Sequence, residues 1–465
     1  MRKLGTIVCG GLAILGLWVR PALAQRQSVA EEILGVLRSE NKISEEKYRE
    51  LMNRAKAENE AREAGLEAFR RDPVKDVKKS IDWLNRFSFS GDMRNRFEGF
   101  YQDGVNARSR ERIRFRFGAT MKISDEVLAG FRLVSGDPND PISSNQTLGE
   151  AFTKKPINID QAYITLTPKE SIGLGDYIWN PISITGGKFP NPLFRPRAVM
   201  TSEMIWDDDL MPEGASETFT FFEGTEGLLR RFQVIAIQWT AREAANQADS
   251  WIVGGQAVGV VQLLSNLRLT GAMGDYYFSH ESLLAQARNS NSQLKMTNSV
   301  VLRDGTIVIG GFPISPGTGG KQIQNYFGRF NIFNGSFQLD YDTGYAKWPA
   351  SLVGDFAVNT DSKTGKNFAV WTGLSFGATK NPGDWAVSAV WAHTETDSVV
   401  SFFSYSDFGR DGGTNVEGPF LRVDYMLFPR LVLTAKNHFV SYIDRPAGQS
   451  NALLNRLQLD AQLSF

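Results

Sequence analysis

The stretch Leu453–Phe465 reads LLNRLQLDAQLSF and alternates between polar and apolar side chains from Arg456 onward. Successive side chains of a strand point to opposite faces, so this stretch predicts a β-strand whose apolar face includes Leu457 and Leu459. A soluble sandwich strand would alternate in the same way, but the end of a soluble domain usually frays, whereas this strand runs flush to Phe465. A sheet in lipid must pair its last strand with its first, because water cannot hydrate an open edge there. The stretch therefore favours a transmembrane barrel.

The same period of two recurs upstream, in segments separated by turn residues. The predicted strands are 86–100, 109–123, 126–136, 158–167, 181–188, 215–223, 230–240, 251–263, 267–279, 331–342, 349–359, 368–378, 384–394, 417–427, 430–442 and 453–465. Short turns alternate with long connections, as expected when only one rim of a barrel needs tight turns. A β-propeller would show a repeat of about 40–50 residues, which is absent from the sequence. The predicted fold is all-β and transmembrane, a 16-stranded antiparallel outer-membrane β-barrel.

The N-terminal residues 1–24 have the pattern of a secretory signal peptide. Arg2 and Lys3 precede an apolar run from Leu4 to Val19, and a small-residue site ends at Ala24. A transmembrane anchor is the alternative, but the run is short for one. The single cysteine lies inside this segment, so the exported chain has no disulfide to stabilise it. We expect the barrel in the bacterial outer membrane and the segment that follows the leader in the periplasm.

Residues 25–80 have helical rather than strand periodicity. Ile33, Leu34 and Leu37 form a helical stripe, and Ile43-Ser44 then begins a second, highly charged helix that Pro73 is expected to end. One interpretation is a solvated helical hairpin that acts as a spacer. The other is a periplasmic coiled coil that trimerises or contacts peptidoglycan. The barrel domain is expected to span residues 86–465.

Charge and barrel size indicate a channel. The formal net charge is +0, and it becomes about −3 without the leader, so nothing favours binding to nucleic acid. A barrel of this width leaves an aqueous lumen unless a domain plugs it, which predicts diffusion of small hydrophilic solutes or ions. Arginines on the polar face of the first three strands would form a basic ladder on the lumen wall: Arg94, Arg96, Arg112, Arg114, Arg116 and Arg132. Alternatively, they pair with wall carboxylates such as Asp92, Glu98 and Asp160.

The segment 189–214 is the candidate constriction of this channel. Its prolines would stiffen a loop folded into the pore. Its opposed charges would align a passing dipole; the candidate residues are Lys188, Arg195, Arg197, Asp207, Asp208 and Asp209. The acidic triplet also has an alternative interpretation as a calcium site, although adjacent aspartates point in different directions. No other metal and no cofactor is expected.

Several motifs resemble those of the bacterial putative porin family. They are Ile43-Ser44-Glu45-Glu46-Lys47-Tyr48, Ser144-Asn145-Gln146-Thr147-Leu148-Gly149, the Gly187–Pro192 turn, and Trp206-Asp207-Asp208-Asp209 with Pro212-Glu213-Gly214. The resemblance covers nearly the whole chain and implies an outer-membrane porin with an N-terminal helical segment. A weaker similarity to phosphate-selective porins leaves an anion- or phosphate-preferring channel as an alternative, although the lysine-rich loop of such a site is missing.

Other functions have less support from the sequence. Outer-membrane hydrolases use serine, histidine and a carboxylate or amide together, and no spacing brings His280, His393 or His438 to a serine, so an enzyme is not expected. A structural barrel that tethers the membrane to the cell wall through its helices is the remaining alternative. The expected partners are outer-membrane lipids, the barrel-assembly machinery that recognises a terminal aromatic strand, further copies in a homotrimer, and peptidoglycan.

Overall fold

The computed structural model describes residues 29–169, 182–197, 199–224, 226–310, 322–409, 412–446, 448–450 and 452–465. Side chains are described throughout these ranges except at 29–30 and 66–82. The predicted signal peptide, residues 1–24, lies outside them. The chain divides into two compact units, Met1–Asn85 and Arg86–Phe465.

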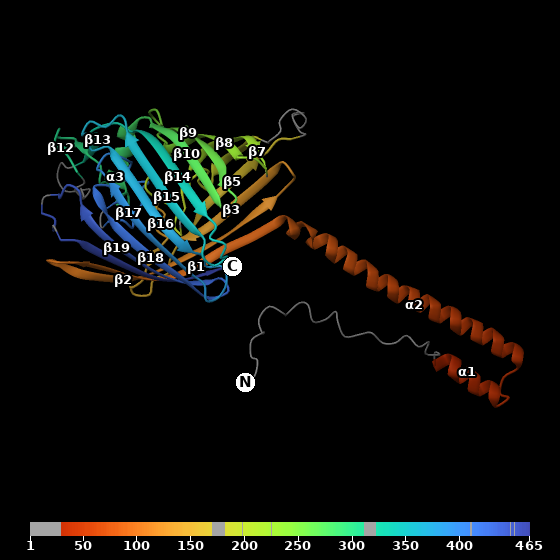
Figure 1. Ribbon diagram of the computed structural model, residues 1–465. Coiled ribbons are helices and arrows are strands. Elements are labelled where there is room, and N and C mark those ends of the chain that lie inside the picture. The colour runs from red at the N-terminus through yellow and green to blue at the C-terminus, as the bar shows by residue number, and fades with distance from the viewer. Residues whose placement is uncertain are drawn as a thin grey trace. The chain divides into compact units, whose positions relative to one another are not determined.

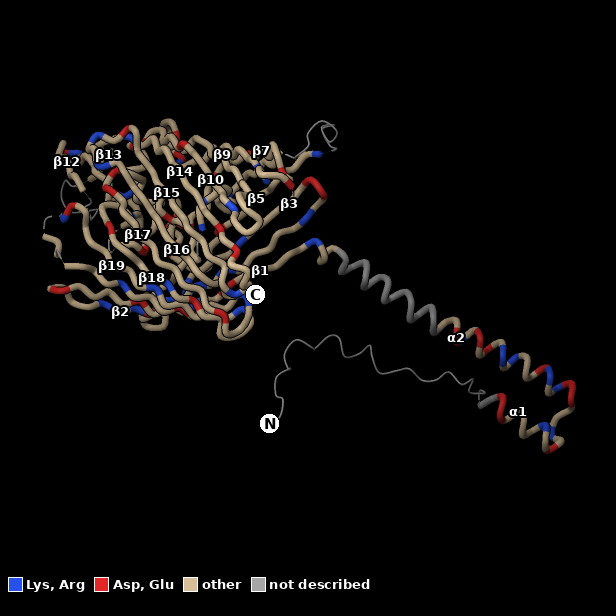
Figure 2. The backbone as a smooth tube through the Cα atoms, viewed as in Figure 1, with Lys and Arg blue, Asp and Glu red and all other residues tan. Residues whose placement is uncertain are grey.

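The first unit contains two helices, α1 (Val29–Ser39) and α2 (Glu45–Ile81), followed by the 3₁₀ turn η1 (Asp82–Arg86). Arg38 joins the helices through an ion pair with Glu45 at 3.0 Å and a guanidinium 4.7 Å from the ring centre of Tyr48. The prediction that Pro73 ends the second helix is wrong. The proline removes a single backbone donor, and the strong helix formers around it carry α2 on to Ile81. Acidic and basic residues are interspersed along the described part of α2, whereas α1 has its glutamates near its start and Arg38 near its end (Figure 2).

None of the helices in the described ranges is long and apolar enough to cross a bilayer.

The second unit is a closed antiparallel barrel (Figure 1). Among the described residues its ring has sixteen strands: β1 (Phe87–Gln102), β2 (Val105–Lys122), β3 (Val127–Ser135), β5 (Ile157–Leu166), β6 (Ile182–Lys188), β7 (Glu213–Glu223), β8 (Leu229–Arg242), β9 (Ser250–Leu264), β10 (Leu267–Phe278), β14 (Asn331–Tyr341), β15 (Ala350–Asn359), β16 (Phe368–Gly377), β17 (Trp385–Thr394), β18 (Val416–Phe428), β19 (Leu431–Tyr442) and β20 (Leu454–Ser464). Each pairs with its neighbour along the chain, and β20 pairs with β1 from Asp92↔Ser464 to Tyr101↔Asn455. The predicted strand count is confirmed, and every predicted strand end lies within four residues of the observed one.

The two faces of the wall differ as the alternation predicts. Large apolar side chains project outward and are exposed on the barrel surface, among them Phe89, Phe131, Ile164, Met273, Leu374, Trp391, Leu421 and Leu459. Polar side chains point inward and are buried, among them Glu98, Gln256, Asp355, His438, Arg456 and Gln458. The outer face therefore presents an apolar surface suited to lipid.

The seam between β1 and β20 is completed at Gly91. Its backbone N–H and C=O exchange hydrogen bonds of 3.0 Å each with the C=O and N–H of Phe465. A Cβ added at Gly91 would lie 2.7 Å from the ring of Phe465, so only glycine allows this close approach.

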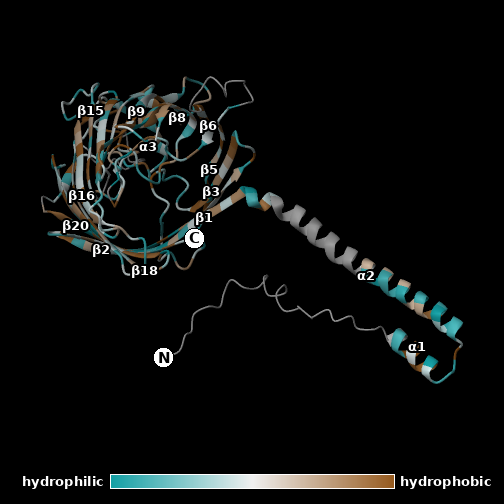
Figure 3. Ribbon diagram, turned by 45° about the vertical axis from the view of Figure 1, so that its right-hand side comes forward, coloured by the Kyte–Doolittle hydropathy of each residue, from teal (hydrophilic) through white to brown (hydrophobic). Residues whose placement is uncertain are grey.

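Longer connections fold into the interior of the ring (Figure 3). The connection between β10 and β14, to which the sequence assigned no element, contains α3 (Glu281–Ser290) and a small sheet of β11 (Val300–Leu302), β12 (Ile307–Val308) and β13 (Ile323–Tyr326). A two-residue strand, β4 (Gln146–Thr147), pairs with β2. Apolar residues of these connections are buried with inward wall residues in one cluster, which includes Trp206, Phe278, Phe330 and Phe402. This inner core positions the site described next.

Candidate functional site

The 189–212 loop, which connects β6 to β7, is held at both ends. The backbone N–H of Phe189 donates to the carbonyl of Pro212 at 3.0 Å, and Lys188 pairs with Glu213 at 2.7 Å. The candidate segment 189–214 therefore includes the first two residues of β7. Further along, the amide of Gln256 on β9 exchanges hydrogen bonds of 2.7 and 2.9 Å with the backbone of Phe194. These contacts fix the course of the loop across the lumen.

Trp206 anchors the middle of this loop inside the barrel. Its ring is buried against Trp239 of β8 and Tyr276 of β10, with centroid distances of 5.2 and 5.4 Å. A third ring, that of Phe403 in the 395–409 segment, lies 6.2 Å away. The carbonyl of Trp206 also accepts a 2.7 Å hydrogen bond from Arg195. An aromatic anchor of this kind holds the residues that follow it, the acidic triplet, in one place.

The three aspartates that follow point to different partners. Asp207 is buried, and its carboxylate accepts the backbone N–H of Ser406 at 3.3 Å. Asp208 pairs with Arg195 at 2.8 Å. Asp209 accepts two 3.0 Å hydrogen bonds from the N–H and hydroxyl of Ser144.

The last contact joins two of the family-like motifs, the one at Ser144 and the one at Trp206. Asp209 also pairs with Arg116 of β2 at 3.3 Å. The described residues contain no group of three or more acidic, histidine or cysteine side chains placed to hold a metal ion. Each carboxylate of the triplet instead has protein partners of its own.

The arginine ladder lies on the inner face of β1, β2 and β3 and is paired with carboxylates. The pairs are Arg96 with Asp460 (2.7 Å) and Asp407 (3.0 Å), Arg114 and Arg116 with Asp92 (2.7 Å each), Arg94 with Asp460 (3.9 Å), Arg112 with Glu98 (3.8 Å), and Arg132 with Asp160. These arginines lie on the inner face of the wall, and Asp92, Glu98 and Asp160 are among their partners.

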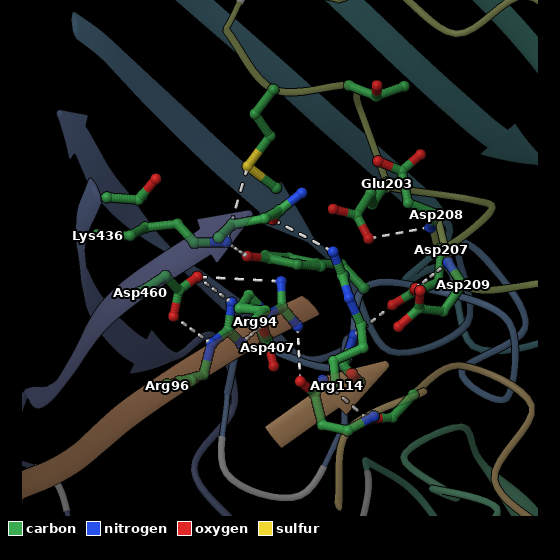
Figure 4. Close-up of a pocket in the computed structure, with 18 of the residues that line it drawn as sticks. Arg94, Arg96, Arg114, Glu203, Asp207, Asp208, Asp209, Asp407, Lys436 and Asp460 are labelled. Carbon is green, nitrogen blue, oxygen red and sulfur yellow. Dashed lines mark hydrogen bonds and ion pairs between the residues drawn. The ribbon is translucent and has the colours of Figure 1, made fainter. Parts of the chain in front are cut away.

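A cavity of about 220 Å³ separates the loop from this wall (Figure 4). Eight of the predicted residues line it: Arg94, Arg96, Arg114, Arg116, Arg197, Asp207, Asp208 and Asp209. Arg112 lines a second cavity of about 460 Å³, which shares Ser143, Asn145, Ser406 and Asp407 with the first. Lys188, Arg195 and Arg132 line neither cavity.

The cavity also contains charged residues that sequence reasoning did not select, namely Glu203, Asp407, Arg422, Lys436 and Asp460. Arg422, Lys436 and Asp460 share the polar face of late strands, so strand alternation was a signal that could have found them. Glu203 and Asp407 lie in loops, where no periodicity assigns a direction to a side chain.

The 395–409 segment supplies the other inner wall of the cavity. The Tyr405 hydroxyl lies 2.7 Å from Nζ of Lys436 and 2.9 Å from Nε2 of His438. Asp407 accepts hydrogen bonds from Arg456 at 2.6 Å and from Gln458 at 3.0 Å, both on β20. The segment is thus fixed to the wall by side chains that are themselves buried.

Burial and neighbouring charges divide the loop carboxylates into two kinds. Burial, reinforced by Asp208, raises the pKa of Glu203 to about 8, and burial with Glu203 nearby raises the pKa of Asp207 well above its usual range. Burial acts on Asp209 in the same direction, but the charges of Arg114 and Arg116 lower its pKa to about 2. Near neutral pH, Asp209 therefore places fixed negative charge on the arginine side of the cavity, while Glu203 holds its proton.

Two of the three histidines contact groups other than serine. His393 contacts Glu417 at 2.8 Å, and His438 contacts Tyr405 and the carbonyl of Arg456. What the site offers chemically is a narrow aqueous space with fixed charges of both signs.

Comparison with known proteins found one family match and several similar solved structures. A family model described as "Putative porin" matches residues 100–306 and 327–461. Similar solved structures include OprB of Pseudomonas putida at high pH, with 13% identity over 84% of this chain and 96% of that one, and a TM-score of 0.49. Another is Salmonella typhi OmpF in complex with daunomycin, with 9% identity over 82% and 97% and a TM-score of 0.45. The trimer form of Vibrio cholerae OmpT matches at 9% over 82% and 99%, with a TM-score of 0.41. No curated protein matches the chain.

Proposed function

Because this chain belongs to the Putative porin family, and is thus a channel of the bacterial outer membrane, we propose that it passes small hydrophilic solutes and ions by diffusion. We place the constriction between the 189–214 segment and the arginine wall of β1 and β2. A solute that crosses must pass charged groups of both signs, which favours hydrated or dipolar molecules over bulky apolar ones.

The observation that carries this proposal is the charge arrangement around the 220 Å³ cavity. Arg94, Arg96, Arg114 and Arg116 line one side, and the loop contributes Asp208 and Asp209. Such charges act strongly on a passing ion because the surrounding protein screens them less than bulk water does.

Reversal potentials in planar bilayers under a salt gradient test the constriction. Arg195 and Asp208 form an ion pair at 2.8 Å, and the Asp208 side chain is 47% exposed. Arg195→Ser leaves the Asp208 carboxylate unpaired and should shift selectivity toward cations. Asp208→Asn leaves Arg195 unpaired and should shift selectivity toward anions. At about 4–8 Å and an effective dielectric near 20, one charge acts at roughly 2–4 kcal/mol before salt screening.

Lys347→Ser is the matched control, because Lys347 is exposed and pairs with Asp384 in the turn between β16 and β17. This variant removes one charge outside the cavity and should leave the reversal potential unchanged. If Arg195→Ser and Asp208→Asn both keep the wild-type value, the 189–214 segment does not form the constriction.

We further propose that residues 1–24 are removed on export and that α1 and α2 lie in the periplasm, where α1 associates with other copies in a homotrimeric coiled coil. The support is an apolar pair one helical turn apart on α1, Ile33 and Val36, which are 53% and 55% exposed. Replacing both with serine should abolish chemical crosslinking between the helices of different copies. Capture of the wild type by purified peptidoglycan, unaffected by these changes, would instead favour the wall-tether function.

A further inference from the structure

Two arginines of the wall lack a carboxylate of their own among the described residues. Arg94 lies 3.9 Å from Asp460, which already binds Arg96 through both oxygens at 2.7 and 2.8 Å. Arg112 likewise lies 3.8 Å from Glu98, whose oxygens are bound to other residues. Unlike Arg114 and Arg116, which share Asp92 at 2.7 Å each, these two guanidinium groups are not neutralised by close partners.

Both carboxylate oxygens of Glu98 accept hydrogen bonds from residues other than Arg112. One of its oxygens accepts Nε of Arg456 at 2.9 Å and the amide of Gln458 at 2.8 Å, and the other is taken by Arg110. Arg112 remains 3.8 Å away, beyond hydrogen-bond distance. The Glu98 carboxylate therefore leaves Arg112 without a direct anionic partner.

The groups that Arg94 and Arg112 do contact are neutral. Arg94 donates to the side-chain oxygen of Asn145 at 2.6 Å, while Arg112 lies 3.5 Å from the Asn145 carbonyl and 3.3 Å from the Ser143 hydroxyl. Their side chains are only 11% and 10% exposed. In both, Nε is buried and has no hydrogen-bond partner within the described part of the chain. A buried cation in this state is costly unless an anion joins it.

The two arginines lie where the two cavities meet. Arg94 lines the cavity of about 220 Å³ and Arg112 the cavity of about 460 Å³, and Ser143 and Asn145 line both. The register places them diagonally across adjacent strands, since Arg94 faces Arg114 and Arg112 faces Arg96. Both guanidinium groups therefore lie beside residues that the two cavities have in common.

We propose that Arg94 and Arg112, with Asn145 between them, form a binding site for an oxyanion, either a carboxylate or a phosphate group carried by the solute. The inference rests on the proposed channel function and adds its substrate class. A guanidinium presents parallel N–H donors that match two oxygens of a carboxylate or phosphate.

Single-channel recording of the full chain in potassium chloride tests the site, with inorganic phosphate and succinate as separate probes. Each probe that occupies the site should reduce the chloride current in a saturable way. Asn145→Asp places a carboxylate where Arg94 now meets an amide oxygen, so it should remove this block without deleting any arginine. Arg94→Gln and Arg112→Gln should each raise the half-blocking concentration by roughly tenfold or more, the scale of one hydrogen bond between charged groups.

Arg268→Gln is the matched control, because Arg268 of β10 pairs with Asp340 of β14 and lines neither cavity. It should conduct and be blocked like the wild type. Saturable block by phosphate alone, or by succinate alone, identifies which oxyanion the site takes. Conducting wild-type channels that neither probe blocks would overturn the site and leave the channel function standing. Folded wild-type protein that forms no channel would instead overturn the proposed function.

Discussion

At the scale of single residues, position along a strand decides which surroundings a side chain meets. On β20, Leu459 projects outward and is 45% exposed, whereas its neighbour Gln458 is fully buried and binds Glu98. One step along the chain thus separates a lipid-facing surface from a buried polar network. Strand alternation alone was enough to predict these two directions.

Replacing Leu459 with arginine should impair assembly. A cation on the lipid face costs roughly 2–4 kcal/mol near the midplane, because nothing there can solvate it. The matched variant is Ser375→Arg, which places the same side chain on the inner face of β16, in register with Ser351 and, one strand further, Asp340. The folded, heat-modifiable fraction on gels should fall for Leu459→Arg and stay near wild type for Ser375→Arg. Equal yields of the two would contradict the assigned faces.

Partners within the wall were also predictable, and partners from the loops were not. Asp92, Glu98 and Asp160 share the polar face of their strands with the arginines, so periodicity already placed them together. Asp407 and Glu203 reach the cavity only because long loops fold inward. Their positions depend on tertiary contacts, which leave no periodic signal in the sequence.

At the scale of elements, two connections cross the lumen and bind each other. The backbone N–H of Asp207 donates to the carbonyl of Phe403 at 2.7 Å, and that of Tyr405 donates to the carbonyl of Glu203 at 3.0 Å. Prolines and opposed charges singled out the segment 189–214 as a candidate constriction, which stays a prediction. The 395–409 segment was not singled out, because its apolar residues are typical of any buried stretch and do not indicate a pore. The helix α3 was missed for a similar reason, since Ser and Asn around it are more typical of turns.

The charge of the 189–212 loop should depend on pH through Glu203. Its carboxylate, close to Asp208, Asp207, Asp407 and Lys436, has a pKa raised by burial to about 8. It is neutral below that value and negative above it, so raising the pH from about 6 to about 10 should shift selectivity toward cations. The folded protein holds this proton more tightly than the unfolded chain, so ionising Glu203 also lowers folding stability.

Reversal potentials measured across this range would show the shift. Glu203→Gln keeps the shape of the side chain without the titration, and it should lose the part of the shift centred near the pKa of Glu203. If that variant and the wild type give the same pH profile, Glu203 does not contribute to the field in the channel.

At the scale of the whole molecule, the barrel depends on one pairing between distant parts of the chain. Every other strand of the ring pairs with its sequence neighbours among the described strands, whereas β1 must meet β20. This pairing followed from the sequence because a sheet edge left open in lipid is excluded. The sequence did not predict whether the long loops enter the lumen, because the strands of the wall alternate in the same way in a water-filled barrel and in a loop-filled one.

Deleting Phe465 should reduce the amount of closed barrel. The deletion removes both 3.0 Å backbone hydrogen bonds to Gly91 and the ring packed against that glycine. Fractionation of cells should show less protein in the outer membrane and more in the periplasm. Phe465→Tyr, which keeps the ring and the backbone, should restore the yield; normal yield without Phe465 would show that these seam contacts are dispensable.

Asp407 joins the 395–409 segment to the seam between β1 and β20, and this limits how the solute selectivity of the channel can change during evolution. One carboxylate binds Arg96 on β1 and Arg456 on β20, so it crosslinks the two strands that close the ring while it also lines the cavity. A substitution of Asp407 that was selected for a new solute would also change how well the barrel assembles. Asp208 lines the cavity and pairs with Arg195 of its own loop, so a change there leaves the contacts between β1 and β20 in place. We therefore expect lineages of this protein to change what they admit through the 189–212 loop and to conserve the Asp407 wall.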